Sequence, residues 1–171
     1  MIIMFVRHAD AKNDKLTKLG KKQLKLMTET RDSVEFSKIY CSPANRCVKT
    51  AQALQSKYKL PIEICEGLKD RELLKSTIPQ TKEEKKWYNN YLNPLYSSEK
   101  PEGCKEYLTR TFMEFERMVK THIEKDENIV IVAHSCTTYA LSAFINGIKK
   151  DHDIVWSRIG NCSRLYFEVK G

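Results

Sequence analysis

The sequence predicts an α/β protein, a three-layer α/β/α sandwich built around a mostly parallel central sheet. Short apolar runs alternate along the chain with longer stretches in which apolar residues recur every three or four positions. Residues 129–133, IVIVA, are apolar without a break, which is typical of a strand buried on both faces of a parallel sheet. A length of 171 residues suits one core, so we expect a single domain over residues 1–171.

Five short runs have the composition of β-strands. The first, residues 2–6, contains β-branched and aromatic side chains and ends at Arg7 and His8. The other four runs are residues 37–42, 61–65, 129–133 and 164–169. Residues 10–15, which follow the first run, are polar, and we expect them to form a loop.

Five segments have the periodicity of helices. They are residues 16–27, 44–58, 82–92, 104–125 and 136–145. We expect Thr17 to cap the first helix, because a threonine hydroxyl can accept from the free amides of a helix start. Pro43 is expected in the first turn of the second helix, where its missing N–H costs nothing.

Residues 76–103 form the least regular part of the chain. Pro79, Pro94 and Pro101 interrupt the segment, and aromatic and basic residues are frequent within it. Irregular insertions on a regular scaffold commonly bind or cover ligands. We therefore expect a lid or substrate-specificity insertion here.

The composition excludes several classes of protein. With 41% hydrophobic and 30% charged residues, the chain is too apolar for a disordered protein. No apolar run approaches the roughly 18 residues of a membrane span, and the opening run is too short for a signal peptide. The six cysteines form no CxxC pair, which favours reduced thiols. We expect a cytoplasmic protein without a membrane partner.

The charge and the possible metal ligands narrow the partners further. A net charge of +8 favours anionic partners, but the lysines are scattered over several helices, so no nucleic-acid partner is expected. His122 and His152 are not spaced as metal ligands, and we expect neither a metal nor a cofactor.

The ends of four predicted strands carry residues suited to one kind of chemistry. Parallel strands end at the same edge of a sheet, so Arg7 and His8, Arg46, Asp70 or Glu72, and His134 are expected to meet there. A neutral imidazole can attack phosphorus, and guanidinium groups match phosphate oxygens. A second histidine, if protonated, stabilises transition-state charge, and a carboxylic acid can protonate the leaving alkoxide. This set indicates phosphoryl transfer through a histidine nucleophile.

Five motifs resemble those of the histidine phosphatase superfamily, also called the phosphoglycerate mutase-like family. In chain order they are VRHA at 6–9, LTKLG at 16–20, SPANRCVKTA at 42–51, LKDREL at 68–73 and VAHS at 132–135. They cover nearly the whole chain in the order found in the family. The resemblance implies a phosphoglycerate mutase-like fold.

The resemblance also implies roles for individual residues. His8 would be the phosphorylated nucleophile, and Arg7, Arg46 and His134 would bind the phosphate. The family's leucine, acid, arginine pattern places the general acid at Asp70, with Glu72 as second choice.

Two further residues are candidates for phosphate binding, and three residues differ from those usual in the family. Asn13 and Ser135 are additional candidates for phosphate binding. Ala9 and Ser135 stand where the family usually has glycine, and Lys49 stands where it usually has glutamine. These changes leave the catalytic side chains intact and bear on the substrate.

We therefore expect a metal-independent phosphatase that hydrolyses phosphomonoesters of small molecules through a phosphohistidine on His8. One alternative is a phosphoglycerate mutase, although family mutases usually have longer chains. Another is a protein phosphohistidine phosphatase acting on a phosphoprotein, which would depend less on a general acid. A basic binding module without enzymatic activity is the remaining alternative, and the complete set of site residues opposes it.

Overall fold

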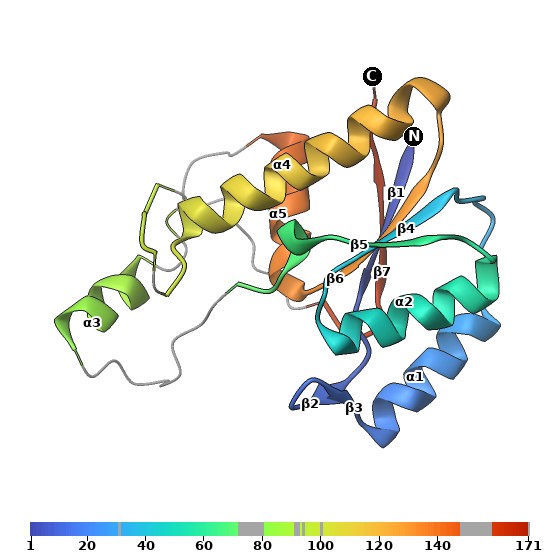
Figure 1. Ribbon diagram of the computed structural model, residues 1–171, viewed down its shortest axis with the longest axis horizontal. Helices are drawn as coiled ribbons and strands as arrows, with labels where there is room; N and C mark the ends of the chain where they lie inside the picture. The colour runs from blue at the N-terminus through green and yellow to red at the C-terminus, as the bar shows by residue number, and fades with distance from the viewer. Residues whose placement is uncertain are drawn as a thin grey trace.

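The computed structural model describes residues 1–30, 32–71, 81–90, 93, 95–99, 101–147 and 159–170 (Figure 1). Its central sheet contains β1 (Ile2–Arg7), β4 (Lys38–Cys41), β5 (Ile62–Ile64), β6 (Ile129–Ala133) and β7 (Arg164–Glu168). The strand order is β5-β4-β6-β1-β7. All neighbouring pairs are parallel except β1 and β7, which are antiparallel. The mostly parallel sheet is thus confirmed.

Helices cover both faces of this sheet, as the sequence predicts. The α-helices of the described residues are α1 (Lys18–Glu29), α2 (Asn45–Tyr58), α3 (Lys82–Asn89), α4 (Cys104–His122) and α5 (Ser135–Asn146). Figure 1 shows α1 and α2 on one side of the sheet and α4 and α5 on the other.

Two buried cores lie on opposite faces of the sheet. Alternate side chains of a strand point to opposite faces, so β1 contributes Ile3 and Phe5 to the core under α4 and α5. It contributes Met4 and Val6 to the core under α1 and α2. Strand β6 divides its residues in the same way, and all five of them are buried. This burial explains its unbroken apolar sequence.

The polar stretch after β1 is a hairpin, whereas the residue pattern predicts a loop there. Strands β2 (Ala11–Lys12) and β3 (Lys15–Leu16) pair antiparallel across a two-residue turn. Asn13 and Asp14 occupy this turn with φ of 49° and 59°. Positive φ at both turn residues is the geometry that closes a tight hairpin, and asparagine and aspartate tolerate it.

Of the two predictions about helix starts, the one for Thr17 is confirmed and the one for Pro43 is wrong. The Thr17 hydroxyl accepts a hydrogen bond from the Gly20 amide, as expected. The expectation for Pro43 is wrong, because α2 begins at Asn45 and its N-cap, Ala44, still has an extended ψ of 132°. Pro43 therefore precedes the helix.

Part of the irregular segment 76–103 is described. Helix α3 starts with a capping box in which Thr81 and Glu84 bond each other's backbone amides. Trp87 is buried, and its indole N–H donates to the carbonyl of Glu102. Figure 1 shows α3 beyond the N-terminal end of α4. The role of this segment as a lid or specificity insertion stays a prediction.

Two expectations from the composition concern the cysteines and the lengths of the helices. All six cysteines are free, as the absence of CxxC pairs suggests. None of the helices in the described ranges combines the length and the apolar character needed to cross a bilayer.

Candidate active site

The candidate site lies where β1, β4 and β6 end. Arg7 is the last residue of β1 and pairs in register with Ala133 at the end of β6. The His8 amide donates to the carbonyl of Ala133 at 3.0 Å, and the Ser42 amide donates to that of Val132 at 3.0 Å. Parallel pairing therefore brings the ends of three strands to one level, the edge at which α/β sheets bind ligands.

His8 is held with one ring nitrogen free of a proton. Its Nδ1 lies 2.8 Å from the carbonyl oxygen of Ala9, which can only accept, so Nδ1 carries the hydrogen. Its Nε2 lies 3.2 Å from Nε of Arg46, which can only donate, so Nε2 presents its lone pair. Burial lowers the pKa of His8, and the charges of Arg46 and Arg7 lower it further against the opposing Ala9 bond. The imidazole is therefore neutral near pH 7.

Arg46 contacts four other side chains, and together these five form the cluster at the site: His8, Arg46, Asp14, Asp70 and His134. Besides His8, its guanidinium donates from Nη1 to Asp14 at 2.9 Å and from Nη2 to Asp70 at 2.8 Å. Nη2 also lies 3.1 Å from Nδ1 of His134. The rings of His8 and His134 have centroids 5.4 Å apart in an edge-to-face arrangement. One planar cation thus gathers two imidazoles and two carboxylates.

His134 is almost fully buried, with 1% of its surface exposed. Its Nε2 lies 2.8 Å from the hydroxyl of Ser42, and its Nδ1 faces the Arg46 donor. Burial lowers the pKa of His134 to about 4, although the charge of Asp70 opposes the shift. The positive charge anticipated for His134 therefore needs a bound anion beside it, which would favour the protonated ring.

Asp70 is fixed by contacts on both carboxylate oxygens. Oδ2 accepts from Arg46 and lies 3.3 Å from Nδ1 of His134, while Oδ1 accepts from the Arg71 amide at 3.1 Å. The thiol of Cys136, in the first turn of α5, also donates to Oδ1 at 3.0 Å. The side chain is still 44% exposed, so the acid is both oriented and accessible.

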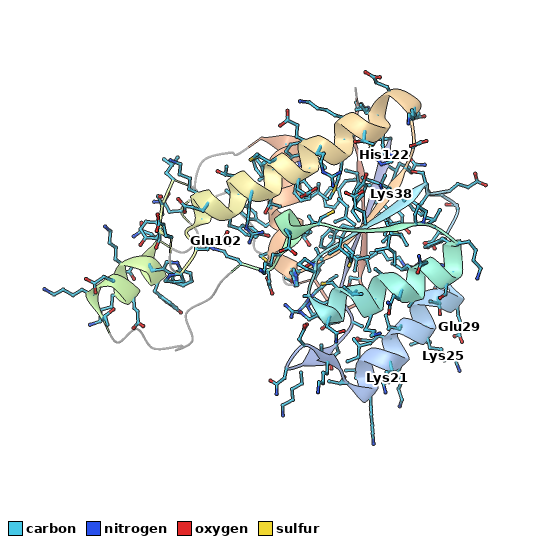
Figure 2. The ribbon with its side chains drawn as sticks, in the orientation of Figure 1. Lys21, Lys25, Glu29, Lys38, Glu102 and His122 are labelled. Carbon is cyan, nitrogen blue, oxygen red and sulfur yellow. The ribbon has the colours of Figure 1, made fainter. Side chains whose placement is uncertain are left out.

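Arg110 of α4 holds the backbone of the Asp70 loop. Its guanidinium donates to the carbonyls of Gly67, Lys69 and Asp70 at 2.9, 2.9 and 3.3 Å. It also forms two bonds to the Glu102 carboxylate, at 2.6 and 2.8 Å. Figure 2 shows Glu102 at the N-terminal end of α4. Arg110 therefore links the irregular segment, through Glu102, to the loop that carries Asp70.

Two buried polar atoms at the site have no partner within the described part of the chain. Nε of Arg7 is one, although Nη1 of the same guanidinium donates to the carbonyl of Ile159. The other is the hydroxyl of Ser135, the first residue of α5. A buried polar group without a partner is costly in a core but suits a ligand site. Both residues thus remain candidates for phosphate binding.

Two other predicted residues are not part of this cluster. Asn13 is exposed at the tip of the β2–β3 hairpin, and its side chain makes no hydrogen bond to the described residues. Glu72 lies outside the described residues. The roles proposed for both stay predictions.

Sequence reasoning missed four residues that contact the site. Ser42 directly follows β4 and belongs to the motif at 42–51, so its position could have indicated its role. Asp14 is adjacent to the candidate Asn13, but only the hairpin turn directs its carboxylate to Arg46. Cys136 and Arg110 project from helices, and nothing in the sequence pattern distinguishes them from packing residues.

The cluster contains nitrogen donors and isolated carboxylates. Across the described ranges, no group of three or more histidine, cysteine, aspartate or glutamate side chains is arranged to hold a metal ion. The guanidinium and imidazole donors at the site suit an oxyanion because of their own charge and geometry.

Solved structures with this fold include enzymes that act on phosphate esters. An Escherichia coli protein described as an alpha-ribazole-5'-P phosphatase superposes with a TM-score of 0.80 at 17% identity, over 99% of this chain and 91% of that one. A mycobacterial glucosyl-3-phosphoglycerate phosphatase gives 0.75 at 18% identity, over 96% and 88%. Bacillus stearothermophilus YhfR gives 0.76 at 21% identity, over 99% and 92%. These identities are low, so the three likenesses establish the fold alone.

Family membership follows from the sequence itself. No curated protein matches the chain. The family model of the histidine phosphatase superfamily (branch 1), however, matches residues 3–171, almost the entire chain. Members of this superfamily are phosphohydrolases or phosphomutases. The chain therefore belongs to branch 1 of the histidine phosphatase superfamily.

Proposed function

We propose that this protein is a metal-independent phosphatase that hydrolyses phosphomonoesters of small molecules through a phosphohistidine on His8. The observation that carries the proposal is the contact between Nε2 of His8 and Nε of Arg46 at 3.2 Å, from which we infer that Nε2 is the unprotonated ring nitrogen. A nucleophilic lone pair beside a phosphate-binding cation is what in-line attack requires. The E. coli and mycobacterial structures with this fold are described as small-molecule phosphatases, which supports the same class of substrate.

The first half-reaction transfers the phosphoryl group to the enzyme. Arg7, Arg46 and His134 bind the phosphoryl oxygens and stabilise their charge. Nε2 of His8 forms a bond to phosphorus while the bond from phosphorus to the ester oxygen breaks. Asp70, as the general acid, gives a proton to the departing alkoxide.

The second half-reaction returns the enzyme to its starting state. Asp70, now a carboxylate, takes a proton from a water molecule as that water attacks phosphorus. The bond between phosphorus and His8 breaks, and inorganic phosphate leaves. The hydrogen bond from Nδ1 of His8 to the Ala9 carbonyl keeps the ring oriented in both steps.

The test compares wild type with His8→Ala on an aryl phosphate and a panel of phosphorylated metabolites, with a chelator present. We expect hydrolysis by wild type with chelator and a loss of at least about a thousandfold in His8→Ala. His122→Asn is the matched control, since His122 bonds Tyr40 and Glu127 at the opposite end of the sheet (Figure 2). Full activity in His8→Ala would refute the proposal.

A second assay separates hydrolysis from the mutase alternative. The protein is incubated with 3-phosphoglycerate and a bisphosphoglycerate primer, and both 2-phosphoglycerate and inorganic phosphate are measured. Our proposal expects phosphate as the product. Faster formation of 2-phosphoglycerate would assign the chain to the mutases instead.

A further inference from the structure

Asp14 occupies a position in the site that the proposed mechanism does not use. It is the second residue of the β2–β3 turn, and the turn is docked on the start of α2 through a bond from the Asn45 side chain to the Asp14 carbonyl at 2.8 Å. The Asp14 carboxylate accepts hydrogen bonds from the backbone N–H of Asn45 at 2.8 Å and from the backbone N–H of Arg46 at 3.1 Å. It also accepts from Nη1 of Arg46 at 2.9 Å.

The three donors that Asp14 engages are those suited to a phosphoryl group. Free amides at a helix start and a guanidinium both bind oxyanions. The N-cap of α2, Ala44, has no side chain that could satisfy these amides, so Asp14 serves in its place. The other terminal nitrogen of Arg46 is shared by Asp70 and His134. A bound phosphoryl group must therefore share Arg46 with Asp14 or displace it.

The negative charge of Asp14 is secure at neutral pH. Burial alone would raise its pKa, but the bonds from the Arg46 and Asn45 amides and the Arg46 guanidinium outweigh this and lower the pKa. The Asp14 side chain is 43% exposed, which moderates its repulsion of a bound anion without removing it.

We propose that Asp14 sets the affinity of the site for phosphate by competing with the phosphoryl group for Arg46 and the α2 amides. This inference rests on the proposed phosphatase function. Competition by a carboxylate fixed in the chain weakens the hold on inorganic phosphate and so speeds product release. Such a device suits hydrolysis, in which phosphate must leave, more than a mutase cycle, in which the phosphoryl group stays bound.

The test measures the dissociation constant of inorganic phosphate by titration calorimetry in wild type, Asp14→Asn and Asp14→Gly. Both substitutions remove the charge and tolerate the positive φ of 59° at this turn position. We expect phosphate to bind about tenfold more tightly in both variants, the order of effect of one like charge at a partly exposed site. The KM for a phosphomonoester should fall in parallel.

Glu29→Gln is the matched control, because it removes one carboxylate at the end of α1 far from the hairpin (Figure 2). It should bind phosphate as wild type does. Equal or weaker phosphate binding in both Asp14 variants, with melting temperatures like that of wild type, would overturn the inference and leave Asp14 a helix cap only. Turnover in the same samples reports separately on the proposed function, which fails if wild type hydrolyses no phosphomonoester.

Discussion

Two clusters of charged side chains link distant parts of this chain, and their chemistry differs. One is centred on Arg46 at the carboxyl ends of the strands. The other is centred on Asp32, in the connection between α1 and β4. Both join a carboxylate to arginine, but only one contains histidines. The contrast shows how ion pairs that build a fold differ from those that serve a site.

The carboxylate at the centre of the Asp32 cluster is closed to solvent and fully paired. The Asp32 side chain is 3% exposed and accepts from Lys57 and Arg164, each at 2.6 Å. The hydroxyls of Tyr58 and Tyr166 also donate to it. Every contact of this carboxylate joins it to another element, so we assign the cluster to stability.

The Arg46 cluster is open by comparison. Its carboxylates, Asp14 and Asp70, are 43% and 44% exposed. Buried donors on Arg7 and Ser135 have no partner within the described ranges. Exposed carboxylates and unsatisfied donors are poorly suited to holding a core and well suited to receiving a ligand. The comparison therefore predicts that substitutions in the two clusters affect different quantities.

The largest effect is expected from Arg46→Ala. Removing the cation that joins His8, His134 and the phosphoryl group should lower kcat/KM by about a thousandfold or more. Arg46→Lys should recover little, because an ammonium group cannot make the same planar contacts. Steady-state kinetics with an aryl phosphate measures both, and wild-type kcat/KM in Arg46→Lys would show that planar geometry is unimportant.

Asp32→Ala should act on stability alone. It leaves Lys57 and Arg164 without a counterion in a buried cluster, which typically costs about 3–5 kcal/mol in the free energy of unfolding. Denaturant unfolding measures this loss. The kcat/KM per folded molecule should match that of wild type. A large fall in kcat/KM would show that the Asp32 cluster also affects activity.

Stability should also depend on pH through Asp32. Burial raises its pKa, but the bonds from Lys57, Tyr58 and Tyr166 and the charge of Arg164 outweigh this and lower the pKa from 3.8 to about 2. A lowered pKa stabilises the folded state above the unfolded value and loses that contribution as pH falls toward 2. The stability difference between wild type and Asp32→Asn should therefore shrink by about 2 kcal/mol between pH 5 and pH 2. A difference constant over this range would contradict the lowered pKa.

The smallest effect concerns the thiol that orients Asp70. Cys136→Val removes the donor 3.0 Å from Oδ1, and we expect kcat to fall about fivefold, in line with the loss of one hydrogen bond. Cys136→Ser keeps a donor and should retain more activity than the valine variant. Equal kcat in the two variants would show that packing, and not the hydrogen bond, is what matters here.

The sequence predicted the parts of the site that strand ends determine. His8 and His134 directly follow apolar strands, so the parallel sheet alone brings them together. A motif places Arg46 near the start of a helix, which is enough to predict it as a site residue. The family pattern favours Asp70 over Glu72 as the acid, and Asp70 contacts Arg46 and His134.

The contacts that sequence could not predict depend on how separate elements dock. The Asp14 carboxylate reaches α2 only because a turn with two positive φ angles folds the hairpin back on that helix. Arg110 meets the Asp70 loop through the packing of α4 on that loop. No periodicity or motif encodes such contacts, since they arise from the assembled fold.

The most direct test of the account asks whether His8 becomes phosphorylated. Wild type, His8→Ala and His122→Asn are mixed with a phosphomonoester, quenched rapidly in denaturant at alkaline pH and analysed by mass spectrometry of the peptides. We predict one phosphoryl group on His8 in wild type and in His122→Asn, and none in His8→Ala. Sustained turnover by wild type without phosphorylation at His8, or undiminished turnover in His8→Ala, would contradict the account.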